Sequence, residues 1–208
     1  WGMGALGFTF ISPEAAKAWV HRYYNNLLHH PFRLAEYPAN PNIAMVSGFM
    51  CAETDEEARE KAAGWTFFIF ALSRYGRKGI DAPGESDLWA EYQMWRDSDK
   101  AKEAVDNALV GSPKTIREKL WQFQKSHVDQ VILLNQAGKT SHQDICASLE
   151  MFAKEVMPEF TAEETAHQAW KQGVLGGKIV SEDTDLQTND QTSTQDANIL
   201  SMSPGKLP

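Results

Sequence analysis

The chain has 208 residues, two cysteines and a formal net charge of −8, with 20 basic against 28 acidic residues. This length suits one ordinary domain, and the scattered basic residues argue against nucleic acid, which requires a clustered basic surface. Two cysteines without metal-ligand spacing exclude a disulfide framework. No apolar run approaches the roughly 18 residues of a membrane span, so we expect a cytoplasmic protein without a membrane partner.

The first predicted unit is a strand followed by a capped helix. Residues 4–10 are mostly apolar and predict the strand. Ser12 offers a capping oxygen, and Pro13 suits the first helical position, where no N–H is needed. The adjacent His29 and His30 point in different directions on a helix and lack a third ligand, so we expect no metal site. In the helix that begins at Pro13, the spacing of apolar residues predicts a buried face of Ala16, Val20, Tyr23 and Leu27.

The second predicted unit begins with a buried strand at residues 43–51. Thr54 and Glu57 follow it with the spacing of a capping box, in which each side chain bonds to the other residue's backbone N–H. The helix that they start should reach about Tyr75. Its buried stripe is expected to comprise Ala58, Ala62, Trp65, Ile69 and Leu72.

Residues 76–100 differ from the rest because they combine glycine and proline with three aromatic residues: Trp89, Tyr92 and Trp95. A connection of this length in an α/β unit is usually functional. A glycine-hinged aromatic segment suits a lid over an apolar substrate, which these three side chains would contact. Residues 88–95 could equally form a short amphipathic helix that packs on the outside.

Residues 111–158 predict helix, strand and helix. Ser112 and Pro113 repeat the cap and first-position pattern of the first helix. Residues 128–135 are apolar on both faces, as in a strand that is covered on both sides. A final helix should begin after Thr140 or Ser141 and end at Pro158, with an inward face of Ile145, Leu149, Phe152 and Val156.

The rhythm of strand, cap and amphipathic helix occurs three times, which predicts parallel strands with helices on one outer layer. We expect the last three βα units of a (β/α)8 barrel at residues 1–160, with residues 76–100 as a lid-like insertion. A helical extension should follow at residues 161–180. Residues 181–208 are polar and predict a disordered tail. Three units leave unpaired strand edges, so we expect that upstream sequence or another chain supplies further strands.

In parallel βα folds, ligands bind at the carboxyl ends of the strands. The predicted ends present Phe8, Thr9, Phe10 and Ile11, then Met50, Cys51 and Glu53, then Asn135, Gln136 and Gly138. A single carboxylate cannot serve a glycosidase, and no cluster there suits a metal hydrolase. No serine-hydrolase elbow or glycine-rich dinucleotide motif occurs. An aromatic, amide-rich surface instead favours a flat cofactor that carries the chemistry itself.

Three motifs in order, at residues 110–115, 128–133 and 148–160, resemble the C-terminal end of the bacterial luciferase-like flavin-dependent monooxygenases. Residues 2–10 resemble the strand that lines the flavin ring in this family, and residues 54–58 resemble the start of its next-to-last barrel helix. Residues 76–100 fall where the family has a mobile active-site loop. The similarity extends over about residues 2–160.

The resemblance implies a (β/α)8 barrel that reacts reduced flavin mononucleotide (FMN) with O2 to oxidise a small organic substrate. A separate flavin reductase would supply the reduced FMN, and a homo- or heterodimer is expected. The implied cofactor contacts are Gly7, Phe8, Thr9, Phe10, Asn135 and Gln136. The family's phosphate-binding turn and early-strand residues have no counterpart here, so no catalytic residue is assigned. We therefore expect the 208-residue chain alone to bind flavin weakly or not at all, and to be inactive.

Two other hypotheses remain open. A deazaflavin-dependent oxidoreductase of the same fold would transfer hydride without oxygen and would use the same strand ends. A non-catalytic partner subunit would support a catalytic chain without turnover. Comparing the two flavins in a cofactor titration distinguishes the first alternative from the monooxygenase, and the absence of binding would favour the second.

Overall fold

The structure, a computed structural model, describes residues 3–8, 13–29, 40–78, 85–135 and 138–179, except for the side chains of residues 8, 13–15 and 76–78. The predicted contacts Thr9, Phe10 and Gln136 and the predicted tail lie outside this part. In chain order the elements are β1 (Ala5–Phe8), α1 (Pro13–His29), β2 (Ile43–Cys51), α2 (Asp55–Lys61), α3 (Ala63–Lys78), α4 (Leu88–Trp95), α5 (Asp99–Asp106), β3 (Leu109–Gly111), α6 (Pro113–Lys125), β4 (Gln130–Leu134), α7 (His142–Glu155), α8 (Met157–Ala162) and α9 (Glu164–Leu175).

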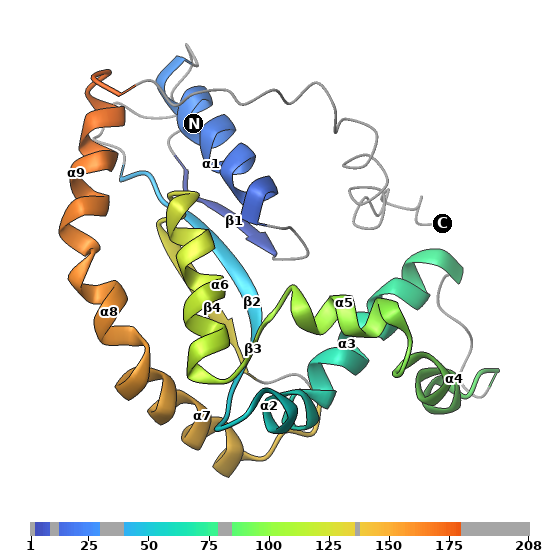
Figure 1. Cartoon of the computed structure of the whole chain (residues 1–208). Helices are drawn as coiled ribbons and strands as arrows, with labels where there is room; N and C mark the ends of the chain where they lie inside the picture. The colour runs from blue at the N-terminus through green and yellow to red at the C-terminus, as the bar shows by residue number, and fades with distance from the viewer. Residues whose placement is uncertain (1–2, 9–12, 30–39, 79–84, 136–137, 180–208) are drawn as a thin grey trace.

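The sheet is built around β2, and all of its described pairings are parallel (Figure 1). Residues 5–8 of β1 pair with residues 43–46 of β2, and residues 130–134 of β4 pair with residues 44–48. Because these two stretches of β2 overlap, β1 and β4 must lie on opposite edges of it. The short β3 pairs with residues 49–51, at the carboxyl end of β2. The predicted parallel βα rhythm is thus confirmed, although β3, with three residues, was too short to be recognised by periodicity.

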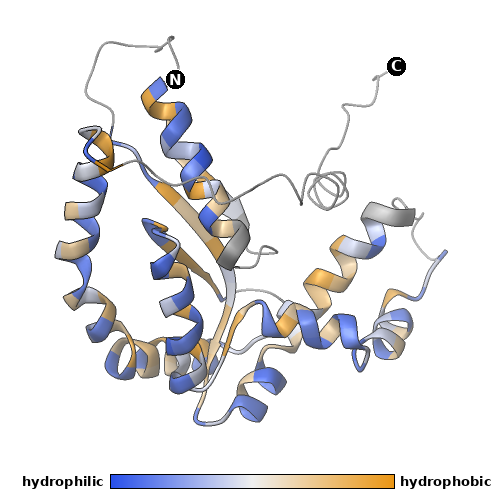
Figure 2. Ribbon diagram, turned by 45° about the horizontal axis from the view of Figure 1, so that its top comes forward, coloured by the Kyte–Doolittle hydropathy of each residue, from blue (hydrophilic) through white to orange (hydrophobic). Residues whose placement is uncertain are grey.

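The central strand β2 is buried along its whole length because side chains on its two faces enter different cores. Ile43, Met45 and Phe49 pack on one face in a core that also includes residues of α1, α6 and α9. Met50 and Ala52 point the other way, into a second core built with α2, α3 and α5. Figure 2 shows the apolar colouring of α3 and the strands where these helices meet the sheet. Helices therefore cover both faces of β2 near its carboxyl end, whereas a single outer layer was predicted.

A glycine makes the second core possible. A Cβ atom added to Gly48 would lie 2.2 Å from the indole ring of Trp65, so the ring lies directly on the backbone of β2. Trp65 is the third residue of α3, and it is 4% exposed. The close approach of α3 to the sheet therefore depends on the absence of a side chain at position 48.

The predicted helix after β2 is divided in two. Thr54 caps α2 as expected, and its Oγ1 accepts a hydrogen bond from the N–H of Glu57 at 3.2 Å. The Glu57 carboxylate pairs with Lys61 at 2.8 Å, which is the i,i+4 contact of an exposed helix face. The prediction of one helix to Tyr75 was wrong, because α2 ends at Lys61 and α3 starts at Ala63 to place Trp65 on the sheet.

Three further predictions need correction. In α1 the fully buried aromatic residue is Tyr24, at 0% exposed, rather than Tyr23. Residues 128–135 were expected to be covered on both faces, but the side chain of Ile132 is 37% exposed because β4 is an edge strand within the described sheet. Pro158 does not end the last predicted helix: α7 stops at Glu155, and Pro158 lies in the first turn of α8, where a missing N–H is tolerated.

Candidate functional site at the carboxyl ends of the strands

The four strands are parallel, so their carboxyl ends meet at one side of the sheet, as Figure 1 shows for β2, β3 and β4. In parallel α/β folds this is the side where ligands bind. The polar groups at these ends come from the residues that follow each strand. Most of them are engaged in holding the elements together, which limits what the site offers to a ligand.

The end of β2 is closed. Cys51, predicted to face a ligand, is 3% exposed, and burial raises the pKa of its thiol to about 11. Its backbone N–H donates to the buried hydroxyl of Ser148 on α7 at 2.7 Å. Met50 is 1% exposed and belongs to the core beneath α2 and α3. The prediction that these two side chains face a ligand was therefore wrong, because Cys51 is buried in the first core and Met50 in the second. Glu53 is exposed.

Asp55 at the start of α2 is engaged in the structure as well. Its Oδ1 accepts from the backbone N–H of Ser112 at 2.6 Å, and its Oδ2 accepts from the hydroxyl of Thr115 at 2.9 Å. The hydrogen bond from the Ser112 backbone is the largest cause of a lowered pKa at Asp55. The carboxylate ties α2 to the first turn of α6 and thus holds the ends of β2 and β3 together.

Asn135, which directly follows β4, differs from these groups. Its Nδ2 donates to the backbone carbonyl of Leu133 at 3.0 Å, which fixes the side chain next to the strand end. Its Oδ1 is buried and has no hydrogen-bond partner within the described part of the chain. A buried amide oxygen without a partner is costly, and it can be satisfied by a ligand that supplies an N–H or O–H donor. Among the predicted cofactor contacts, Asn135 is the one for which the structure shows an available polar atom.

The predicted contact Gly7 lies in β1, and its side-chain position faces Met45 and the helix α1. A Cβ atom there would lie 3.0 Å from the sulfur of Met45 and 3.5 Å from the ring of Trp19 on α1. Any ligand contact of Gly7 on the other face would therefore involve its backbone. Phe8 is the last residue of β1, and its side chain lies outside the described part.

The predicted substrate residues Trp89, Tyr92 and Trp95 are brought together on α4. The rings of Trp89 and Tyr92 lie 5.4 Å apart, and those of Tyr92 and Trp95 lie 6.4 Å apart. They pack on α3, where the ring of Phe70 is 5.7 Å from Tyr92 and 5.4 Å from Trp95. The predicted helix over 88–95 is confirmed with these bounds.

An ion pair fixes α4 on α3. Two guanidinium nitrogens of Arg74 donate to the Glu91 carboxylate, with Nε to Oε2 at 3.0 Å and Nη2 to Oε1 at 3.1 Å. The Arg74 side chain is only 5% exposed. Trp89, on the same helix, remains 61% exposed. The lid role of α4 stays a prediction, and the described contacts show how the helix is held in the present arrangement.

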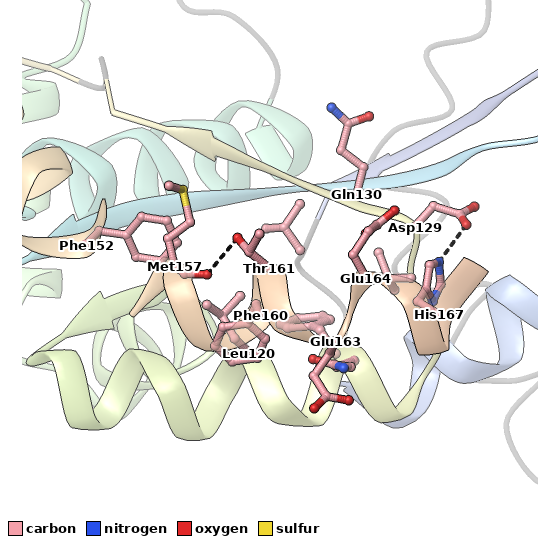
Figure 3. Close-up of a pocket in the computed structure, with 14 residues that line it drawn as sticks. Leu120, Asp129, Gln130, Phe152, Met157, Phe160, Thr161, Glu163, Glu164 and His167 are labelled. Atoms are coloured by element: carbon pink, nitrogen blue, oxygen red, sulfur yellow. Dashed lines mark hydrogen bonds and ion pairs between the residues drawn. The ribbon is translucent and has the colours of Figure 1, made fainter. Parts of the chain in front are cut away.

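A cavity of about 330 Å³ lies at the other end of the sheet (Figure 3). It opens between β4, α6 and the row of α7, α8 and α9. Its wall is mainly apolar, with Phe123, Phe152 and Phe160 among the lining residues, and Glu163 and Glu164 contribute carboxylates. This cavity is at the amino end of β4, so it does not coincide with the predicted cofactor site.

Next to this cavity, sequence reasoning missed a buried polar cluster centred on Asp129. Oδ2 accepts from the Tyr24 hydroxyl at 2.7 Å and from the Ile43 N–H at 2.8 Å. Oδ1 lies 2.9 Å from His167 Nε2 and 3.2 Å from Lys171 Nζ. The side chains of Asp129, His167 and Lys171 are 3%, 9% and 8% exposed. The i,i+4 spacing of His167 and Lys171 on one helix was the available signal, but their partner is far away in sequence.

No group of three or more His, Cys, Asp or Glu residues in the described ranges could hold a metal ion. Within the same ranges, no helix combines the length and the hydropathy that a membrane span requires.

Comparison with known proteins gives a fold assignment. No family model matches the chain. The uncharacterized protein YceB of Bacillus subtilis (strain 168) is 28% identical over 121 residues, which represent 57% of this chain and 34% of YceB. The coenzyme F420-dependent tetrahydromethanopterin reductase of Methanopyrus kandleri superposes with a TM-score of 0.50 at 20% identity, covering 76% of this chain and 45% of that one. Apo-MsnO8 also superposes with a TM-score of 0.50 at 20% identity, covering 74% of this chain and 45% of MsnO8.

The chain thus spans about a third of the curated relative and less than half of the two solved proteins. At this identity, the superpositions show that the fold is shared. The sheet and its helices correspond to part of a parallel α/β barrel, which confirms the predicted fold class.

Proposed function

We propose that this chain is part of a luciferase-like flavin-dependent monooxygenase that uses reduced FMN and O2 to oxidise a small organic substrate. The observation that carries the proposal is the ordered motif set at residues 110–115, 128–133 and 148–160, which lies on β3, α6, β4, α7 and α8 of a parallel α/β fold. FMN would supply the oxygen-activating chemistry, and a separate flavin reductase would supply its reduced form.

The donor and acceptor groups at the strand ends are compatible with a flavin ring. The ring presents N–H donors at its edge, and the buried Oδ1 of Asn135 is an acceptor without a partner in the described ranges. Asn135 would therefore bind the polar edge of the ring, together with Gln136. Gly7, Phe8, Thr9 and Phe10 would contact the flat ring from β1 and the residues after it.

The aromatic cluster on α4 would serve the substrate. Trp89 is 61% exposed and lies against Tyr92, so it offers an apolar surface on α4, which the buried Arg74 of α3 anchors. We assign Trp89, Tyr92 and Trp95 to the binding of an apolar substrate and to the exclusion of water from the reacting centre.

A deazaflavin-dependent reductase is the second candidate, and the fold shared with the F420-dependent enzyme of Methanopyrus kandleri favours it. A deazaflavin has the same polar ring edge, so Asn135 would serve both cofactors. The two candidates differ in oxygen use, because only the monooxygenase consumes O2 with the reduced cofactor.

The test uses the polypeptide encoded by the complete reading frame that contains these 208 residues. It is titrated without oxygen with reduced FMN and, separately, with reduced deazaflavin, and oxygen uptake is then measured in the presence of a flavin reductase. We expect micromolar binding of reduced FMN and flavin-dependent oxygen uptake. Preferential deazaflavin binding without oxygen uptake supports the reductase, and a failure to bind either cofactor refutes both.

Asn135→Ala should weaken cofactor binding by about 1–3 kcal/mol, because the ring edge loses its acceptor. The matched control is Asn107→Ala, which alters an exposed amide at the end of α5. Equal affinities of the two variants would show that Asn135 does not contact the cofactor.

A further inference from the structure

One position inside β2 has no side chain on the face that meets the second core. Gly48 lies between Val46 and Met50 on this face, because side chains alternate along a strand. A Cβ atom there would lie 2.2 and 2.3 Å from the two carbons that the rings of the Trp65 indole share. The indole therefore covers the bare backbone with its flat face, and Trp65 is 4% exposed. A glycine inside a strand often marks a site where a ligand approaches the backbone closely.

The neighbouring strand places the available amide beside this position. Leu134 of β4 pairs with Gly48, and Asn135 is the next residue. Neighbouring strands lie about 4.8 Å apart, so Asn135 begins one residue beyond the strand position that flanks the indole. Its Oδ1 is buried and lacks a hydrogen-bond partner within the described part of the chain. The arrangement with Trp65 on Gly48 thus leaves a buried acceptor unsatisfied, which is costly.

A contact between two glycines brings the start of α3 onto the residues that follow β4. A Cβ atom on Gly138 would lie 2.7 Å from the Cα atom of Gly64, the residue before Trp65. Gly138 has a φ of +75°, which glycine adopts without strain. Neither residue has a side chain that interlocks with the other segment. Separation of α3 from the end of β4 therefore breaks little side-chain packing at this point.

The helices on the two sides of Ala62 are held by different partners. The Asp55 carboxylate ties α2 to the first turn of α6. The ion pair of Arg74 and Glu91 ties α3 to α4. A single residue, Ala62, separates α2 from α3. A change of its backbone angles would move α3 and α4 together, while α2 keeps its place beside the sheet (Figure 1).

We propose that the Trp65 indole is an internal occupant of the slot over Gly48, and that the flat ring of the cofactor takes this place when α3 moves away. This inference rests on the proposed function. The ring would lie on the bare backbone of β2, with its polar edge at Asn135 Oδ1. Trp65 thereby sets the affinity, because the apparent dissociation constant is the intrinsic one divided by the fraction of molecules with an open slot.

Opening of the slot is tested on the 208-residue chain without cofactor. Positions 50 and 51 are adjacent, but Met50 is buried in the second core and Cys51 in the first. Met50→Cys combined with Cys51→Ala and Cys146→Ala has one thiol, at position 50, whereas Cys146→Ala alone retains Cys51. Both proteins are labelled with dithiodipyridine in native buffer, and each rate is corrected for the unfolded fraction obtained from urea denaturation.

We expect the thiol at position 50 to react at least tenfold faster than Cys51, because movement of α3 uncovers the second core and leaves the first intact. Equal corrected rates would overturn the proposal, since the second core would then open only when the whole chain unfolds.

Affinity is tested on the polypeptide encoded by the complete reading frame, by anaerobic titration with reduced FMN. Trp65→Leu keeps an apolar side chain but removes the flat group from the slot, so it should bind reduced FMN at least tenfold more tightly than wild type. The control Trp121→Leu alters an indole on α6, outside this site, and should leave the affinity unchanged.

The outcomes separate this inference from the proposed function. Equal or weaker binding by Trp65→Leu, where wild type binds reduced FMN, overturns the inference and leaves the proposed function in place. Absence of binding by both proteins refutes the proposed function and the cofactor as the occupant of the slot. The labelling rates decide in either case whether α3 uncovers the slot.

Discussion

Asp129 should be one of the most sensitive positions for stability, although it lies at the amino end of the strands, away from the candidate cofactor site. Asp129 directly precedes β4, and its carboxylate joins this strand to three other elements, because Tyr24 lies on α1, Ile43 begins β2, and His167 and Lys171 lie on α9. Asp129→Asn keeps the size of the side chain but removes the negative charge. It leaves the ammonium group of Lys171, 8% exposed, without its carboxylate.

Removal of one partner from a buried ion pair costs about 3–5 kcal/mol of unfolding free energy. With about 2–4 °C per kcal/mol for a domain of this size, the melting temperature should fall by roughly 6–20 °C. Tyr24→Phe removes a single hydrogen bond to the charged oxygen and should cost about 1.5–3 kcal/mol. Urea denaturation followed by circular dichroism measures both changes.

Two controls make this prediction specific. Asp99→Asn alters an exposed carboxylate that pairs with Lys102 and should leave the urea midpoint unchanged. Asp129→Asn combined with Lys171→Met removes both charges and should recover part of the loss. A loss below about 1 kcal/mol for Asp129→Asn would refute the view that this carboxylate organises the four elements.

The same carboxylate should make stability depend on pH. Burial alone would raise the pKa of Asp129, but hydrogen bonds from His167, Ile43 and Tyr24 and the charge of Lys171 together lower it. A lowered pKa in the folded state means that the stabilisation is complete above the unfolded value of about 3.9 and is lost as the pH falls through the lower folded value. The difference in urea midpoint between wild type and Asp129→Asn should therefore shrink below about pH 4, and a difference independent of pH would contradict this assignment.

Three other predictions concern the second core and α4. Gly48→Ala places a methyl group 2.2 Å from the Trp65 ring and should destabilise the fold by about 1–3 kcal/mol in urea denaturation, with a smaller loss in a Trp65→Leu background. Glu91→Gln removes the carboxylate that pairs with the buried Arg74 guanidinium and should lower the unfolding free energy by about 1–3 kcal/mol. The range extends to low values because the Glu91 side chain is 29% exposed. The same variant should accelerate proteolysis between α3 and α4, and an unchanged cleavage rate would show that other contacts hold α4. Thr54→Ala removes the cap of α2 and should lower the unfolding free energy by about 1 kcal/mol.

The sequence by itself determined the local elements and the class of fold. Ser112 with Pro113, Thr54, and Ser141 mark helix starts because a side-chain oxygen satisfies a first-turn N–H, and each cap is present in the structure. The apolar run at residues 43–51 predicted a strand, and β2 has these bounds. These features depend on residues that are close together in the chain, so their physical causes can be recognised in the sequence.

The tertiary structure alone decided which side chains are available to a ligand. Met50 stands at a strand end in the sequence, but the position of Trp65 on Gly48 brings a second helical layer over it, while the neighbouring Cys51 is buried in the first core. The partners of Asp129 are distributed over the chain from Tyr24 to Lys171, and no local pattern connects them. Burial and polar pairing arise from contacts between distant segments, so periodicity and capping cannot specify them.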